Sequence, residues 1–180
     1  MRKKYFILIT IGLGIMGCKR NSKAEIVSSQ IPMEYKSVLD SIKERGKKDR
    51  LFNCNYFLYD ISGDSIPELW TYIGKSEADT RLKTYTILNG KAQLIYDGAG
   101  NHISHFICNT QLIGVINIIE EGVMITYDYD GKQVTESTVE FSTWNDEGIA
   151  LSKPHDSIAD EMLNCWQNDN IKHIEFKAIY

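Results

Sequence analysis

Several sequence signals of common activities are missing from this chain of 180 residues. It has four cysteines but no Cys-x-x-Cys pair, which argues against a zinc ribbon or a thioredoxin-type redox site. The Gly-x-Ser-x-Gly signature of many serine hydrolases is absent. Acidic residues outnumber basic ones by 24 to 20, so we do not expect nucleic acid as a partner, because its phosphates are neutralised by Lys and Arg.

A long apolar run is also missing, and the apolar stretch at the N-terminus is a short one. The basic residues Arg2, Lys3 and Lys4 precede apolar residues from Tyr5 to Met16, which are too few to cross a hydrocarbon core of about 30 Å as a helix. The pattern is typical of a signal peptide. We therefore predict a signal peptide over residues 1–17.

The signal peptide ends in Ile15-Met16-Gly17-Cys18, which resembles a bacterial lipobox. The resemblance implies lipidation of Cys18, with residues 18–30 as the lipidated cysteine and a polar tether. We therefore expect a lipoprotein of the bacterial cell envelope, held to the membrane by its lipid. The alternative is an ordinary secreted protein in which Cys18 is incidental.

A helix is predicted from Pro32 to about Gly46. Proline suits a first helical turn, and glycine is a common C-terminal stop. The apolar residues recur at helical spacing, at Tyr35, Val38, Leu39 and Ile42. The basic run Lys43–Arg50 is then a solvated helix end, or alternatively a contact with anionic headgroups near the anchor.

From Phe52 to Ser142 the sequence is typical of short strands joined by tight turns. Asn89-Gly90 and Asp130-Gly131 are hairpin signals. Because parallel strands need long crossover connections, this pattern favours antiparallel pairing. Eight strands are expected, over residues 52–59, 69–73, 83–88, 92–96, 102–108, 112–118, 123–129 and 132–141.

The pattern changes after these strands. Asp156-Ser157 precedes an apolar stripe that ends at Trp166, which predicts a C-terminal helix. Alternation from Ile174 to Tyr180 predicts a final strand. The expected fold is mainly β, of the α+β class: an antiparallel meander or partial-propeller-like sheet with an N-terminal and a C-terminal helix, in one domain over residues 31–180.

Three cysteines remain once Cys18 is lipidated, and three cannot all pair within one chain. Cys54 and Cys108 lie in predicted strands, so they could form a disulfide in an oxidising envelope if those strands are neighbours. The alternative, which we favour, is that Cys54, Cys108 and Cys165 are buried free thiols that pack as small apolar side chains.

An acidic loop, Asp60-Ile-Ser62-Gly-Asp64-Ser-Ile66-Pro-Glu68-Leu69, separates the first two predicted strands. With the aromatic-rich strand before it, this segment resembles the calcium-binding strand–loop–strand element of FG-GAP and VCBS repeats. From Phe52 to Ser142 the chain also resembles small secreted or lipid-anchored bacterial proteins of unassigned function. In these an Asp-rich loop leads into Pro-Glu-Leu, then Ser-Glu-Ala-Asp, here Ser76 to Asp79, and then a hairpin with Asn-Gly.

The resemblance implies a structural Ca²⁺ site in this loop. Its predicted ligands are the side chains of Asp60, Ser62, Asp64 and Glu68 and the carbonyl oxygen of Ile66. With three carboxylates, the affinity is expected in the weak, millimolar range. An EF-hand is excluded, because its twelfth position is Thr71 rather than glutamate. The alternative is a metal-free loop in which Asp60 and Asp64 accept hydrogen bonds from neighbouring amides.

No motif in the sequence specifies a reaction. We expect a non-enzymatic envelope protein that binds a protein or glycan partner, with the calcium-type loop as a brace. One alternative is a hydrolytic enzyme in which Glu77 and Asp79 act as paired carboxylates. The other is an immunity or structural lipoprotein with a protein partner.

Histidines and aromatic residues give weaker indications. His102 and His105 lie three apart in a predicted strand, so they point to opposite faces and make a poor metal pair. An exposed aromatic platform could be formed by Trp70, Trp144 and Tyr127, but most aromatic residues at this density belong to a core.

Overall fold

The computed structural model describes residues 30–51, 53–118, 121–142, 151–152, 165 and 171–179. The predicted signal peptide, Cys18 and nearly all of the tether lie outside these residues. Within the described part, no helix is long and apolar enough to cross a membrane. The anchoring prediction therefore rests on the sequence alone.

The N-terminal helix α1 (Lys36–Asp49) follows a short 3₁₀ turn, η1 (Met33–Tyr35). Its apolar stripe is confirmed, since Tyr35 and Ile42 are buried and their neighbours pack against the same clusters. The predicted end at Gly46 is wrong. Gly46 is buried on the packed side of the helix, where tertiary contacts outweigh a helical glycine's cost of about 1 kcal/mol.

The helix ends instead at Arg50, which adopts a left-handed conformation with φ of 52°. The backbone N–H of this cap donates to the carbonyl of Gly46, and the N–H of Leu51 donates to the same carbonyl at 3.1 Å. These bonds satisfy an end carbonyl of the helix.

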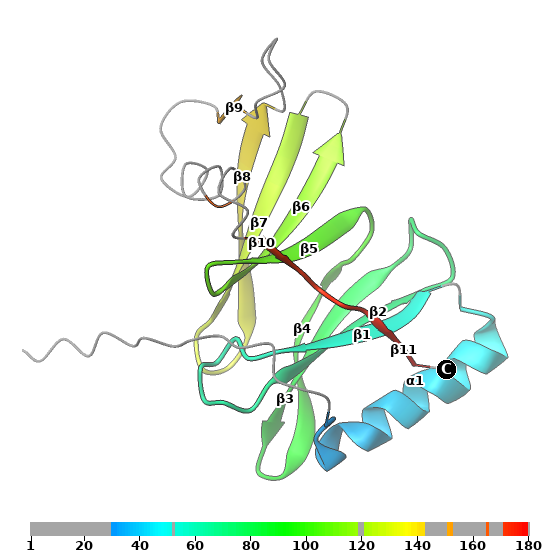
Figure 1. The fold of residues 1–180 in the computed structure, drawn as a ribbon. Coiled ribbons are helices and arrows are strands. Elements are labelled where there is room, and N and C mark those ends of the chain that lie inside the picture. The colour runs from blue at the N-terminus through cyan, green and yellow to red at the C-terminus, as the bar shows by residue number, and fades with distance from the viewer. Residues whose placement is uncertain are drawn as a thin grey trace, which may run out of the picture.

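All eight predicted strands are present, and they form two antiparallel meanders (Figure 1). The first sheet has the order β11-β1-β2-β3-β4. Its strands are β1 (Asn53–Tyr59), β2 (Glu68–Gly74), β3 (Arg81–Leu88), β4 (Lys91–Ala99) and β11 (Lys177–Ala178).

The second sheet has the order β10-β5-β6-β7-β8-β9. The mainly-β, α+β class is thereby confirmed, but the division of the meander after β4 was not predicted. The strands of this sheet are β5 (Ile103–Cys108), β6 (Gln111–Ile118), β7 (Glu121–Tyr129), β8 (Val134–Ser142), β9 (Leu151–Ser152) and β10 (Ile171–His173).

Both predicted hairpin turns are confirmed. Asn89 and Gly90 have φ of 52° and 70° between β3 and β4, the left-handed pair that a two-residue hairpin requires. In the β7–β8 turn, Gly131 has φ of 93°. The carboxylate of Asp130 accepts the N–H groups of Lys132 and Gln133 at 2.8 and 2.9 Å.

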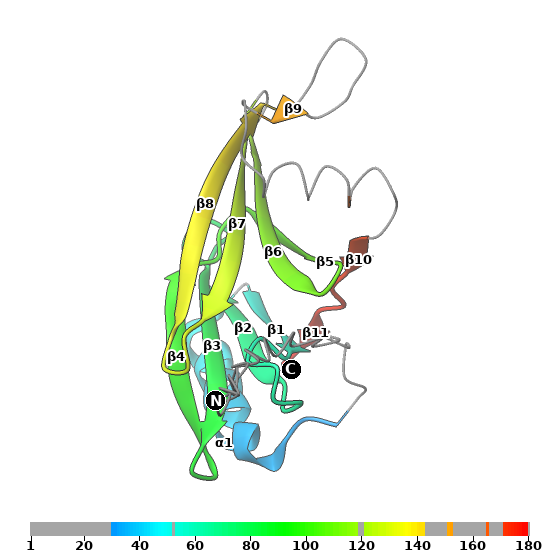
Figure 2. The same ribbon diagram turned by 90° about the vertical axis from the view of Figure 1, so that its left-hand side faces the viewer.

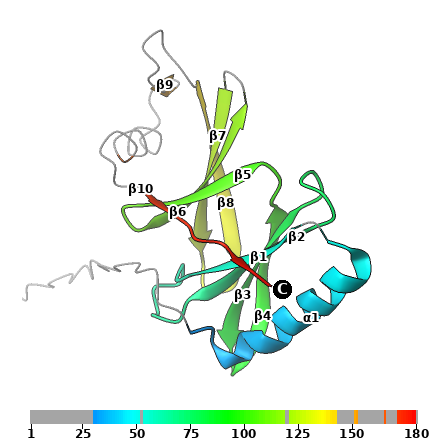
Figure 3. The same ribbon diagram turned by 45° about the vertical axis from the view of Figure 1, so that its right-hand side comes forward.

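The first sheet is covered on both faces at its central strand β2, which is buried along its whole length. Phe57 of β1 and Trp70 of β2 pack against the second sheet, in one core with Ile125 and Tyr127 of β7. On the opposite face, Leu69 packs with side chains of η1 and α1. Figure 2 shows the second sheet extending above the first, and Figure 3 shows α1 alongside the first sheet.

The second sheet is also covered on both faces at β6, as the apolar sequence of this strand predicts. Leu112 belongs to the core between the sheets. Ile113 and Val115 belong to a separate cluster on the other face, together with Met124 and Cys165.

The C-terminal segment joins the two sheets. It pairs with β5 through β10 and with β1 through β11, as the red ribbon shows in Figures 1 and 3. Within the predicted final strand, Ile174 to Tyr180, the described residues form only the short strand β11; β10 precedes it, and each lies at the edge of a different sheet. The predicted helix from Asp156 to Trp166 lies outside the described residues except for Cys165, which is helical.

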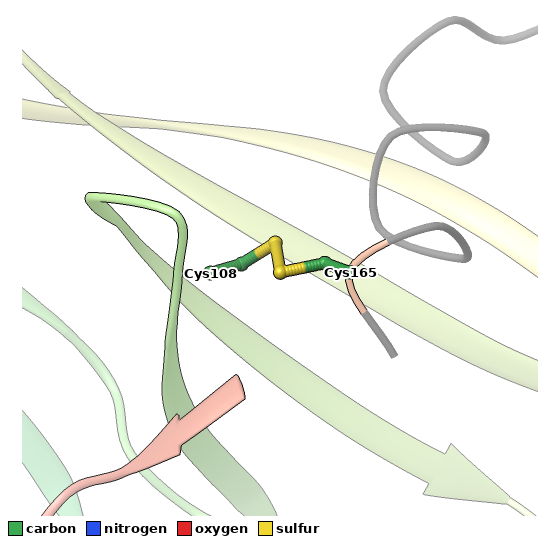
Figure 4. Close-up of a disulfide and its surroundings, with 2 residues drawn as sticks. All are labelled: Cys108 and Cys165. Atoms are coloured by element: carbon green, nitrogen blue, oxygen red, sulfur yellow. A yellow bond between two sulfur atoms is a disulfide. The ribbon is translucent and has the colours of Figure 1, made fainter. Parts of the chain in front are cut away.

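The cysteine predictions are wrong for two of the three residues. Cys108, at the end of β5, forms a disulfide with Cys165, with the two Cα atoms 6.0 Å apart (Figure 4). Cys54 is a buried free thiol, as expected. It lies in the other sheet from Cys108, which is why these two do not pair.

Candidate functional site

The acidic loop folds around the carboxylate of Asp60. This carboxylate accepts the N–H groups of Gly63 and Ser65 at 2.6 and 2.8 Å, and the hydroxyl of Ser62 at 3.2 Å. Gly63 and Ser65 both have φ of 72°, so the chain turns through two left-handed residues. Asp64 accepts the N–H of Ile66 at 2.8 Å.

Glu68 lies at the start of β2 and is fully buried. Its two carboxylate oxygens accept the N–H of Ile61 at 2.8 Å and the hydroxyl of Thr86 at 3.2 Å. Burial raises the pKa of Glu68, while these hydrogen bonds oppose the rise. Glu68 thus ties the loop to β3.

The oxygens predicted to bind Ca²⁺ take part in these hydrogen bonds. The loop brings Asp60, Ser62 and Asp64 together at one turn, as predicted, and their oxygens accept hydrogen bonds from the loop itself. Among the described residues, no group of three or more His, Cys, Asp or Glu side chains is arranged to hold a metal. Calcium binding stays a prediction, and the self-capped loop is the arrangement observed.

A cleft of about 390 Å³ opens at the start of β1, where Asn53 pairs with Gly74, the last residue of β2. The cleft arises from the side chains that alternate between the two faces of β1. Asn53 and Asn55 share the face of Phe57, but they place amides where that face otherwise carries aromatic rings. The lining residues are Asn53, Asn55, Tyr72, Glu77, Thr80, Gly100, His102, Ile103, Ser104 and Phe176.

Two polar contacts set the walls of this cleft. The side-chain amide of Asn53 donates to the hydroxyl of Thr80 at 2.8 Å. His102 Nδ1 lies 3.2 Å from a carboxylate oxygen of Glu77, and both side chains are exposed. The predicted strand from His102 begins instead at Ile103, because His102 occupies the preceding turn with φ of 56°.

Phe176 supplies the aromatic wall of the cleft. Its side chain is 43% exposed, although its ring packs edge-on against Tyr72 and Phe57, with centroids 5.3 and 5.5 Å away. A half-exposed ring with a fixed orientation is suited to stack on the apolar face of a ligand.

Behind Tyr72 lies a buried polar triad that sequence reasoning missed. Tyr72 Oη contacts His105 Nδ1, and His105 Nε2 lies 2.8 Å from Tyr127 Oη. Because the imidazole is buried, the pKa of His105 falls from 6.5 to about 3. The ring is therefore neutral, and the triad bridges β2 to β5 and β7.

The two carboxylates predicted for hydrolysis have different surroundings. Asp79 accepts the N–H and hydroxyl of Ser76 at 2.5 and 3.0 Å and so caps its own turn. The hydrogen bond from the backbone N–H of Ser76 is the main reason why the pKa of Asp79 is lowered, whereas a general acid needs a raised pKa. Only Glu77 of the two lines the cleft.

The expectation that most of the aromatic residues belong to a core is confirmed for Trp70 and Tyr127. Trp70 and Tyr127 are buried in the core between the sheets, and Trp144 lies outside the described residues. The exposed aromatic residue of the cleft is Phe176. The alternating sequence from Ile174 to Tyr180 predicted a strand there but gave no sign that this ring is exposed.

Searches of protein-family models, curated proteins and solved structures each returned no match. The resemblance to the FG-GAP and VCBS calcium element therefore stays a prediction.

Proposed function

We propose that this protein is a lipid-anchored envelope protein that binds a glycan in the cleft between β1 and the β4–β5 turn. Lipidation at Cys18 and the tether of residues 19–30 are proposed from the sequence pattern alone. The self-capped acidic loop, with or without Ca²⁺, would serve as a brace between β1 and β2.

The observation that carries the proposal is the composition of the cleft. Amides, hydroxyls and one imidazole line it beside a single exposed ring, Phe176. Sugars present hydroxyls, which Asn side chains can both donate to and accept from, and apolar C–H faces, which can stack on an aromatic ring. A cleft for an apolar ligand would instead be lined mainly by hydrophobic side chains.

Binding without catalysis fits the same cleft. Glycoside hydrolysis generally needs two carboxylates across the bond that is cleaved. Among the described lining residues, Glu77 is the only carboxylate. Its contact with His102 at 3.2 Å makes it a wall of the cleft rather than half of an acid–base pair.

The test is a glycan array of peptidoglycan fragments and bacterial and host oligosaccharides, probed with wild type, Asn55→Ala and Phe176→Ala. Leu94→Ala is the matched control, because Leu94 is 44% exposed on β4 and does not line the cleft. We expect wild type and the control to retain a saccharide that both cleft variants lose. Retention of no saccharide, or equal retention by all four proteins, would overturn the proposal.

A further inference from the structure

Charge is divided unevenly along this chain. Residues 19–50 contain nine basic and five acidic residues, whereas residues 51–180 contain eight basic and nineteen acidic residues. The protein is acidic as a whole, so the basic character is confined to the segment that leads from the predicted anchor into α1. Such asymmetry indicates a membrane surface or another anionic partner for the basic part.

Three of these basic residues lie along one side of α1, and a fourth, Lys48, lies about 100° further around the helix. Lys36, Lys43 and Lys47 are spaced by seven and four residues, which places them along one side of a helix. All three are exposed, and so is Lys48 next to them. Ile42 and Gly46, which are buried, each precede one of these lysines and so lie about 100° away around the helix. We call these four lysines the lysine face.

Two exposed carboxylates, Asp40 and Glu44, lie among these lysines and offset part of their charge. Lys36 pairs with Asp40 at 2.5 Å, in an exposed contact. Within the described part of the chain, Lys43, Lys47 and Lys48 take part in no ion pair. Four lysines against two carboxylates leave this side of the helix with a net positive charge, which can meet an anionic surface.

The position of the lysine face along the chain favours a bilayer as that surface. The twelve residues from 19 to 30 can extend by at most about 40 Å, so a lipid at Cys18 would keep α1 near the headgroups. Where the tether meets the domain, Met33 is 81% exposed and Ile31 is 37% exposed. These apolar side chains are suited to the boundary between headgroups and acyl chains.

We infer that the lysine face of α1 lies on the anionic phospholipid headgroups of the membrane to which the protein is tethered. Helix α1 covers one face of the first sheet, and the cleft opens from the face that carries Phe57 and Tyr72. Docking through α1 therefore leaves the cleft accessible. The lipid holds the protein at the membrane, and the lysine face sets its orientation.

The test measures membrane binding by the lysine face in the absence of the lipid anchor. The chain from residue 18 onward, with Cys18→Ser so that no acyl chain is present, is sedimented with vesicles of phosphatidylcholine alone or with about one third phosphatidylglycerol. We expect binding only to the anionic vesicles, and we expect it to weaken as salt rises. The anchor proposal can fail without affecting this result.

A matched pair of variants makes the test specific. Lys43→Gln, Lys47→Gln and Lys48→Gln together should weaken binding by at least about tenfold, because each basic residue near an anionic surface contributes separately. The control replaces three exposed lysines elsewhere by glutamine, at Lys75, Lys91 and Lys132, and has the same net charge. Equal loss in both variants, or equal binding of wild type to both kinds of vesicle, would overturn the inference.

Discussion

The buried triad of Tyr72, His105 and Tyr127 makes a specific prediction about stability and pH. His105 is 3% exposed and is held between two tyrosine hydroxyls. Its pKa is about 3 in the fold, against an ordinary value of 6.5. The unfolded chain therefore binds this proton more readily than the folded chain, so stability rises with pH across this interval.

The magnitude follows from the two pKa values. The contribution of neutral His105 is fully present above pH 6.5 and is lost progressively as pH falls toward 3. Between pH 7 and pH 5 the expected loss is about 2 kcal/mol, since one pKa unit corresponds to about 1.4 kcal/mol. The pKa of buried Glu68 is raised. The contribution of Glu68 to stability therefore has the opposite pH dependence to that of His105: it is present at low pH and is lost as pH rises.

The assay is urea unfolding at several pH values between about 7 and 5 with the disulfide intact. His105→Gln keeps a donor and an acceptor in the triad but cannot be protonated in this range. His102→Gln, at an exposed position, is the matched control. We expect the free energy of unfolding to fall more steeply with acid in wild type and His102→Gln than in His105→Gln.

The reasoning is refuted if His105→Gln keeps the full slope. A slope that disappears in His102→Gln instead would place the titrating group in the cleft rather than in the core. Comparing slopes rather than absolute stabilities removes the general effect of the substitution on packing.

Three further predictions concern the loop, the disulfide and the anchor. If the loop binds Ca²⁺, calcium at ten times its Kd should stabilise the fold by about 1.4 kcal/mol. The melting temperature should then rise in wild type but not in Asp60→Ala, and no rise in wild type would contradict the site. Replacing Cys108 and Cys165 together by Ala opens a loop with a sequence separation of 57. This should lower the unfolding free energy by about 4 kcal/mol, and an unchanged urea midpoint would argue against the disulfide. Cys18→Ser should accumulate as an unprocessed precursor on a gel, whereas normal maturation would exclude lipidation at Cys18.

Sequence reasoning performed well where structure is determined locally. The turns at Asn89-Gly90 and Asp130-Gly131 are set by left-handed backbone preferences, and they fixed the strands on either side. The helix stripe was also local. The end at Gly46 was wrong, because a glycine buried on the packed side of a helix is indistinguishable in sequence from one that terminates it.

Features made by distant residues were not predictable. The disulfide joins Cys108 to Cys165 across a separation of 57 residues. Alternation could place His105 inside, but its tyrosine partners come from β2 and β7. The cleft takes its lining from β1, two turns and the C-terminal segment. Only the packing of the two sheets brings these elements together.

The most direct test of the proposed function is an NMR titration of the side-chain amides of Asn53 and Asn55 with the saccharide retained on the array. We predict that both resonances shift with the same Kd and that Phe176→Ala weakens this Kd. Shifts confined to residues outside the cleft, or none at saturating saccharide, would contradict the assignment of this cleft as the binding site.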